Sequence, residues 1–292
     1  MRKGSWWLIL ATLLWSGNYV AGRFLAHQIA PLTLNAIRWV VSALILAVML
    51  RVSGRRIPWH HYQPLLILGF LGMFAFSSLT YIGLTTVPAA QAGMISGTIP
   101  VLIMIASVIL LGAHPKPLGW VGVALSVVGV SVMVGSQTTQ QMHVSQGDFE
   151  LIGAAVAWSL YTVLARKWST SMDPLTLTTG SAIAGAFFSI VAAFLIDKPL
   201  SAHLTAPGIF AVVYVSTAAS VIAYVVWTTG VANVGAPSAA PFMNLLPVWT
   251  VILGVTLLKE SISTTQILGG TMAVCGALLS GRPTRTTKTL AS

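Results

Sequence analysis

The sequence of 292 residues contains two related copies of one pattern. The tetrapeptide Pro-Leu-Thr-Leu occurs at 31–34 and again at 174–177, an offset of 143 residues that becomes 147 further along the chain. The pairs of positions that match at these offsets include Trp15 and Trp158, Arg23 and Arg166, Tyr81 and Tyr224, Pro100 and Pro247, and Gly122 and Gly269. Matching over such a distance predicts that the two halves of the chain share one fold.

Both copies are too apolar for a soluble protein. Hydrophobic residues make up 56% of the chain and charged residues only 7%, whereas roughly a quarter of residues are charged in soluble domains. A helix needs about 20 apolar residues to cross a bilayer. Segments of this kind are predicted at 5–26, 32–52, 63–84, 88–112, 117–136, 147–167, 174–196, 206–230, 237–258 and 264–281. The predicted fold is an all-α polytopic membrane protein with ten transmembrane helices.

The ten segments divide equally between the copies. Because five is odd, the second repeat must cross the bilayer in the opposite direction to the first, and inverted repeats of this kind are typical of secondary transporters. The predicted domains are a first five-helix repeat at 1–136, a linker at 137–146, a second repeat at 147–281 and a basic tail at 282–292. The fifth and tenth segments carry no internal charge and are rich in glycine, so we expect them at the periphery.

Basic residues fall mainly on one side of the predicted membrane. With the N-terminus inside, the cytoplasmic side receives Arg2, Lys3, Arg51, Arg55, Arg56, Lys116, Arg166, Lys167, Arg282, Arg285 and Lys288. The outer side receives only Arg23, Lys198 and Lys259. This asymmetry orients membrane helices and predicts that both termini are cytoplasmic. It also accounts for the net charge of +10, so the predicted surroundings are a lipid bilayer and no nucleic-acid partner.

Polar and aromatic side chains within the predicted spans are the candidates for a functional site, because hydrocarbon cannot satisfy their hydrogen bonds. They form stripes in the first and third spans that recur in the sixth and eighth. The candidate substrate-binding residues are Trp15, Asn18, Tyr19, Arg38, Ser77, Tyr81, Trp158, Tyr161, Tyr224, Trp227, Thr228 and Asn244. Each stripe alone is also compatible with simple hydrogen bonding between helices. The recurrence in both halves favours a shared central cavity.

The roles of three residues within the predicted spans have more than one interpretation. Arg38 is the fully charged side chain that lies well within a predicted span. It either snorkels to the outer interface, anchors a substrate carboxylate, or holds a gate closed through backbone carbonyls. Pro100 and Pro247 are predicted near the middles of the fourth and ninth spans, where proline bends a helix. They are either hinges or static kinks.

Several functional classes lack their usual signatures. The predicted spans contain no Asp or Glu, so there is no evident proton relay. A phosphate-binding loop and a His-Glu-x-x-His motif are both absent. We therefore predict no cofactor, no metal site and no enzymatic activity, and an intramembrane enzyme or assembly factor is the remaining alternative of another class.

Three features in register resemble a known transporter family. They are the Trp15–Asn18 segment Trp-Ser-Gly-Asn, Pro31 followed by Arg38 in the second span, and Glu260 followed by Gly269. Together with the repeat architecture, they resemble the EamA branch of the drug/metabolite transporter superfamily. The first repeat departs from the family pattern, since it has Ala113-His114 where the second has Glu260.

That resemblance implies ten helices around a central cavity, alternating access between the two membrane faces and a bacterial inner-membrane location. The aromatic-rich first, third and sixth spans are most similar to exporters of aromatic amino acids. The functional hypothesis is a secondary transporter that exports neutral or aromatic amino acids or similar small metabolites. The alternative within transport is efflux of drugs or other metabolites. The sequence leaves the oligomeric state open, with a monomer plausible.

Overall fold

The computed structural model describes residues 3–26, 28–58, 62–87, 92, 95–135, 145–197, 203–249, 252 and 264–280. All regular elements in these ranges are helical, and their bounds follow chain order. They are α1 (Lys3–Leu25), α2 (Pro31–Val52), α3 (Tyr62–Leu68), η2 (Gly69–Ala75), α4 (Phe76–Thr86), α6 (Ile99–Leu111), α7 (Pro117–Gly135), α8 (Gln146–Trp168), α9 (Pro174–Ala192), η3 (Ala193–Asp197), α10 (Ala206–Thr217), η4 (Ala218–Ile222), α11 (Ala223–Val234), α12 (Ala236–Ala239), η5 (Ala240–Asn244) and α14 (Thr264–Ser280).

Within the described ranges, six helical stretches are long and apolar enough to cross a membrane. They are Gly4–Leu25, Pro31–Val52, Tyr62–Thr86, Gln146–Trp168, Pro174–Asp197 and Ala206–Val234. Shorter apolar helices occur at Ile99–Leu111, Pro117–Gly129 and Ile267–Gly276. Parts of the predicted fourth and ninth spans, most of the linker, the whole basic tail and Glu260 lie outside the described residues.

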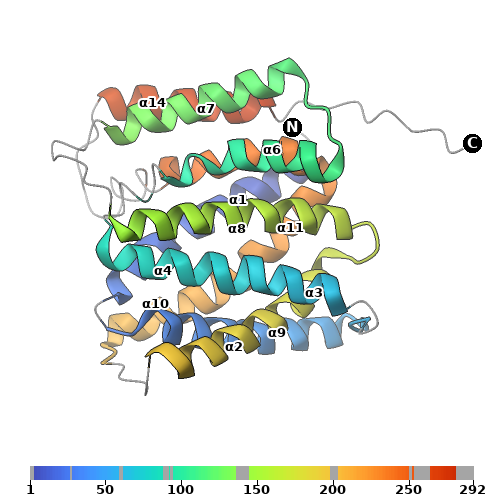
Figure 1. Cartoon of the computed structure of the whole chain (residues 1–292), viewed down its shortest axis with the longest axis vertical. Coiled ribbons are helices and arrows are strands. Elements are labelled where there is room, and N and C mark those ends of the chain that lie inside the picture. The colour runs from blue at the N-terminus through green and yellow to red at the C-terminus, as the bar shows by residue number, and fades with distance from the viewer. Residues whose placement is uncertain are drawn as a thin grey trace, which may run out of the picture.

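The helices lie side by side in a bundle, with their axes running roughly across Figure 1. The α7/α14 pair forms one edge, the α2/α9 pair forms the opposite edge, and α1, α4, α8 and α11 lie between them. Glycines bring α7 and α14 into close contact. A Cβ atom on Gly129 would lie 2.5 Å from the Ala273 nitrogen, and one on Gly276 would lie 2.5 Å from the Gly122 carbonyl oxygen. The peripheral position of this pair agrees with the sequence pattern.

The central helices pair across the linker. α1 packs along α11, and α8 packs along α4. Both contacts use glycine. A Cβ atom on Gly230 would lie 3.2 Å from the carbonyl oxygen of Gly4, and one on Gly83 would lie 3.0 Å from that of Gly147. Each of these helices is thus fixed by a partner from the other half of the chain.

The repeated tetrapeptide Pro-Leu-Thr-Leu begins a helix in both copies. Proline fits the first turn because its missing N–H is not needed there. In α9 the preceding Asp173 accepts hydrogen bonds from the backbone of Leu175 and Thr176, both at 3.1 Å. In α2 the corresponding cap comes from another helix, since Asp197 at the end of η3 accepts from the backbone of Thr33 at 2.6 Å. Both carboxylates satisfy free N–H groups at a helix N-terminus.

Three of the long spans contain a π-helical segment: η2 between α3 and α4, η4 between α10 and α11, and η3 after α9. A π-helical turn disrupts the regular hydrogen-bond ladder and is frequent at functional sites. Here η2 and η4 supply backbone acceptors to the centre of the bundle. The Gly72 carbonyl in η2 accepts from the Tyr224 hydroxyl at 2.9 Å, and the Ala219 carbonyl in η4 accepts from the Trp15 indole at 2.8 Å.

Pro100 and Pro247, which match at the offset of 147, lie at breaks between helical segments and not at bends within one continuous helix. Pro100 lies in the first turn of α6, directly after a turn at Gly97–Thr98. Pro247 lies in a helical turn at 245–249 that follows the 3₁₀ segment η5. The sequence predicted a kink in the middle of each helix, whereas the structure has a break at each position. The physical reason is that proline fits the first turn of a helix but not its interior.

Candidate functional site

The charged side chain of α2 points into the protein. Arg38 is 1% exposed, so the interpretation that it snorkels to the membrane interface is wrong. Its Nε donates to the Ser220 hydroxyl in η4, and its Nη1 donates to the Tyr81 hydroxyl in α4 at 2.8 Å. Tyr81 in turn donates to Asn18 Oδ1 in α1 at 2.9 Å. Four helical elements from both halves of the chain thus meet at one guanidinium group.

The Arg38 charge has no carboxylate partner within the described ranges, where the ion pair that forms is Arg55–Asp173 at 2.7 Å. Aromatic rings compensate part of the charge, since the guanidinium carbon lies 5.0 Å from the Trp39 ring centroid and 5.6 Å from that of Tyr81. Cation–π contacts and neutral hydrogen bonds stabilise a buried cation less than an anion does. The site can therefore accept an anionic group.

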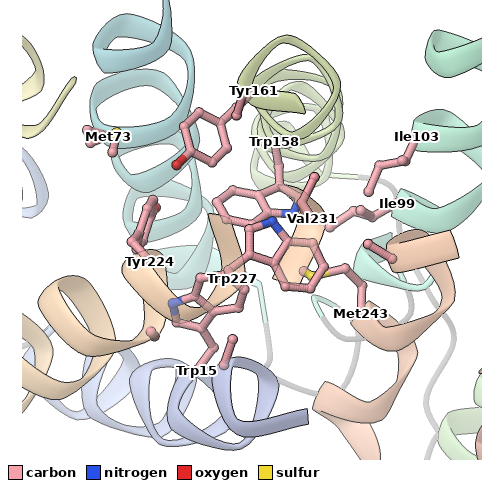
Figure 2. Close-up of a cluster of buried hydrophobic side chains, with 14 of the residues drawn as sticks. Trp15, Met73, Ile99, Ile103, Trp158, Tyr161, Tyr224, Trp227, Val231 and Met243 are labelled. Carbon is pink, nitrogen blue, oxygen red and sulfur yellow. The ribbon is translucent and has the colours of Figure 1, made fainter. Parts of the chain in front are cut away.

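A cluster of aromatic rings lies beside this polar group, and we call it the aromatic cluster. Its members are Trp15 of α1, Trp39 of α2, Trp158 and Tyr161 of α8, and Tyr224 and Trp227 of α11. Figure 2 shows five of them converging from three helices. The Trp158 centroid lies 4.8 Å from that of Trp15, 5.1 Å from that of Tyr161 and 5.8 Å from that of Trp227. Trp15–Trp158 is edge to face, as are the contacts of Tyr224 with Trp15, Trp39 and Trp158, and the ring quadrupole favours this arrangement.

The rings of the cluster fill the space between the helices in this conformation. Trp158, Tyr224 and Trp227 are fully buried, so water does not reach them. The expected role as walls of an open cavity is thus not realised in this state, because the rings contact one another instead. A ligand can enter only where these rings separate.

Some of the indole and hydroxyl groups in the aromatic cluster have a hydrogen-bond partner and others do not. Trp15 donates to a carbonyl of η4 and Tyr224 donates to a carbonyl of η2, while the Tyr161 hydroxyl lies 3.2 Å from that of Thr228. Within the described residues, the indole nitrogens of Trp39, Trp158 and Trp227 have no hydrogen-bond partner. Figure 2 shows the rings of Trp158 and Trp227 in the middle of the cluster. An unpaired buried donor costs about 1–3 kcal/mol, so all three are available to an acceptor.

The polar group and the aromatic cluster adjoin each other. Trp39 joins them, because its ring contacts the Arg38 guanidinium on one side and the Tyr224 ring, with centroids 4.9 Å apart, on the other. The site therefore has a cationic, hydrogen-bonding end and an apolar aromatic end, in direct contact.

The remaining sequence-predicted residues lie at different distances from this centre. Tyr19 is buried and its hydroxyl lies 3.1 Å from that of Ser96, while Ser77 is buried in α4. Asn244 lies against the peripheral helices instead. Its amide donates to the Ser126 hydroxyl of α7 at 3.0 Å. Its apolar neighbour Met243 turns toward the aromatic cluster, so the two side chains leave η5 on different sides.

Sequence reasoning missed two residues of the site, Trp39 and Asn35. Trp39 had a detectable signal because it adjoins Arg38 in the sequence, whereas Ser220 was indicated by its match to Ser77 at the offset of 143. Asn35 was detectable as an amide within a span. Its Nδ2 donates to the hydroxyls of Ser78 and Ser189, both at 3.0 Å, and so links α2 to α4 and α9.

Comparison with known proteins places the chain in a family. The model of the EamA-like transporter family matches residues 2–135 and again 145–282. The chain belongs to the EamA-like transporter family. Together with the apolar helices, this establishes a multi-pass membrane protein, and the resemblance read from the sequence is confirmed at this level.

Individual EamA-like relatives cover most of the chain. The chain is 29% identical over 217 residues to the uncharacterized transporter YyaM of Bacillus subtilis, covering 73% of this chain and 71% of the relative. It is 28% identical over 280 residues to an uncharacterized transporter of Archaeoglobus fulgidus, covering 93% and 95%. A solved crystal structure superimposes with a TM-score of 0.81 at 22% identity, covering 96% of both chains. At that identity the superposition shows the shared fold alone.

Proposed function

We propose that this EamA-like protein is a secondary transporter that exports neutral amino acids with aromatic side chains from the bacterial cytoplasm. Membership of a transporter family supports the transport role. The observation that carries the substrate proposal is the buried Arg38 guanidinium, which has no carboxylate partner within the described ranges and adjoins a cluster of aromatic rings. An aromatic amino acid carries both a carboxylate and an aromatic ring, so it would complement both ends.

The residues divide between the two ends of the proposed substrate. Arg38 and Tyr81 would bind the carboxylate, and the Asn18 carbonyl would accept from the amino group. The rings of Trp15, Trp158 and Tyr224 would surround the side chain. Because the substrate loses its water on entry, these few polar groups must replace the lost hydrogen bonds, which makes the site selective.

The packing of the helices supports an inverted repeat. α1 packs along α11 as α8 packs along α4, and Gly4 in the first contact matches Gly147 in the second at the offset of 143. The matched arginines behave alike as well. Arg23 donates to the Leu84 carbonyl near the end of α4, and Arg166 donates to the Ala232 carbonyl near the end of α11.

Alternating access would then open one end of the bundle while the other is closed. At the predicted outer end, the Gln28 side chain accepts from the Thr205 backbone at 3.0 Å, and the Gln28 carbonyl accepts from the His203 backbone at 3.0 Å. These bonds join the two halves of the chain and must break for the outer mouth to open. The helix breaks at Pro100 and Pro247 would serve as hinges.

Counterflow in proteoliposomes tests the proposal. The purified protein is reconstituted with internal phenylalanine, and uptake of labelled phenylalanine is measured against a panel of competitors. We expect aromatic amino acids to compete, and phenylethylamine and phenylalanine methyl ester, which lack the carboxylate, to compete at least tenfold more weakly. Equal competition by the amine, or exchange of cationic drugs without exchange of amino acids, would favour the drug-efflux alternative.

A further inference from the structure

A second candidate binding site lies far from the aromatic cluster, at the C-terminal end of α2. A cavity of about 510 Å³ there is lined by Ala47, Leu50, Arg51, Arg55, Arg56 and Ile57. All of these residues belong to α2 or to the loop that follows it. Figure 1 shows α2 at an edge of the bundle, opposite the α7/α14 pair. Because α2 is long and apolar enough to span a membrane, its end is expected at a membrane surface.

Within the described residues, the positive charge of this cavity is only partly compensated. Its lining contains three arginines and no acidic residue. The Arg55 guanidinium donates to Asp173 at 2.7 Å, which compensates one of the three charges. Arg51 and Arg56 form no ion pair with any residue in the described ranges. The cavity therefore retains two positive charges and can bind a phosphate group through guanidinium N–H donors.

An apolar surface borders the basic cavity. Leu44, Val48 and Val52 follow one another at intervals of four along α2, so they form a single stripe. Their exposed fractions are 65%, 63% and 83%. Arg51 lies on the neighbouring face of the same helix turn. A ligand that fills both surfaces must have a negatively charged head and a hydrocarbon tail.

We propose that the end of α2 is a binding site for an anionic phospholipid. Arg51 and Arg56 bind its phosphate, and Leu44 and Val48 contact its acyl chain. Basic pockets beside transmembrane helices bind anionic head groups, and each arginine near the membrane surface contributes about fivefold in affinity. This site is independent of the amino-acid site, so either proposal can fail without the other.

The test compares lipid retention by full-length variants. Each protein is reconstituted into nanodiscs of phosphatidylcholine containing a minor fraction of phosphatidylglycerol, then released, and its bound lipids are counted by native mass spectrometry. The wild-type protein is expected to retain phosphatidylglycerol in preference to phosphatidylcholine. The double variant Arg51→Gln/Arg56→Gln is expected to lose this preference by roughly 30-fold, since two fivefold contributions are removed.

Matched controls separate a specific site from general charge attraction. Lys116→Gln/Lys167→Gln removes two exposed charges from the same predicted membrane side and should retain phosphatidylglycerol. Leu44→Ser/Val48→Ser leaves the charges but should weaken retention several-fold, because it removes the acyl contacts. Inorganic phosphate added at constant ionic strength should not displace the lipid.

Any of three results would overturn the proposal. They are undiminished retention by Arg51→Gln/Arg56→Gln, an equal loss in the lysine control, or full displacement by inorganic phosphate. The last result would identify the cavity as a site for soluble phosphates instead.

Discussion

Tyr81 and Tyr224 occupy matching positions in the two halves of the chain, yet their surroundings differ. Tyr81 binds Arg38 and Asn18, in the polar part of the site. Tyr224 binds the Gly72 backbone carbonyl and is enclosed by tryptophan rings. The position that matches Arg38 in the second copy is Ser181, a small neutral side chain whose hydroxyl has no partner among the described residues.

This difference shows how a duplicated framework can form an asymmetric site. The repeat places a tyrosine at both positions, and a single charged residue in one copy makes its surroundings polar. Because the two halves pack against each other, the polar and aromatic surroundings adjoin, and Trp39 contacts both. The first three predictions test this contrast at the two tyrosines and beside them, and the fourth applies the same reasoning to a charge at the surface.

The largest effect is expected from Arg38→Met. Removal of the guanidinium should lower amino-acid exchange at least about 30-fold, because truncating one partner of a desolvated charge pair costs about 2–5 kcal/mol. The substrate-free variant should nevertheless unfold at an equal or higher temperature, because a buried unpaired charge is replaced by an apolar side chain. Proteoliposome counterflow and thermal unfolding measure the two effects.

Arg38→Lys is the control for this variant. It keeps the charge but loses the planar fork, so its exchange activity should lie between those of wild type and Arg38→Met. If Arg38→Met lowers the unfolding temperature as well as the rate of exchange, Arg38 has a structural role. The contrast between the two halves would then not concern substrate binding.

A substitution beside the aromatic cluster should act on stability instead. In Gly72→Ala the added Cβ would collide with the ring of Tyr161, which is fully buried and cannot move away. Overpacking of this kind costs about 1–3 kcal/mol, and thermal unfolding of the purified protein should show the loss. Gly119→Ala is the matched control, because its nearest neighbouring atom lies 3.8 Å away. Equal effects of the two substitutions would mean that the packing around Tyr161 is loose.

Removing the hydroxyl from each tyrosine compares the two environments directly. Tyr81→Phe leaves a buried guanidinium N–H unpaired and should lower the free energy of unfolding by about 1.5–3 kcal/mol, the range for hydrogen bonds to charged groups. Tyr224→Phe removes a neutral bond to a backbone carbonyl and should cost only about 1 kcal/mol. Thermal unfolding of both variants gives the order, and a larger loss for Tyr224→Phe would reverse the assignment of the polar end.

The smallest effect is expected at the surface. Arg55 and Asp173 form an ion pair whose side chains are 51% and 37% exposed. Solvent screens such pairs, so Arg55→Gln should change the free energy of unfolding by less than about 1 kcal/mol. Asp173→Ala should cost more than Arg55→Gln, since it removes the cap of α9 as well as the ion pair. Similar losses for the two variants would mean that the cap adds little.

Much of the architecture followed from local patterns. Hydrophobic segments of membrane length predicted α1, α2, α8 and α9 closely, and the glycine-rich, uncharged fifth and tenth segments were predicted at the periphery, where α7 and α14 lie. Local patterns did not predict the helix breaks at Pro100 and Pro247, because a proline in the sequence is equally compatible with a kink and with the start of a new helix. The π-helical segments η2 and η4 had no signal, since they depend on contacts with other helices.

The sequence predicted which residues form the candidate site, but not that their rings pack together. The repeat identified Trp15, Tyr81, Trp158 and Tyr224 as inward-facing side chains, and all four are buried at the centre. Sequence alone suggested that they line an open space, whereas the rings pack together. Whether two inward-facing side chains contact each other or leave a gap depends on helix separation, which is set by glycines and π-helical turns far away in the chain.

The sequence by itself determined that this chain enters a membrane and is built from two copies. Both conclusions depend on local properties, the length of the apolar segments and the identity of matching residues, which do not require knowledge of how the helices pack. Only the tertiary structure decided that Arg38 turns inward rather than toward the interface. The physical reason is that its partners, Ser220 of η4 and Tyr81 of α4, come from both halves of the chain and reach one guanidinium only after the helices have packed.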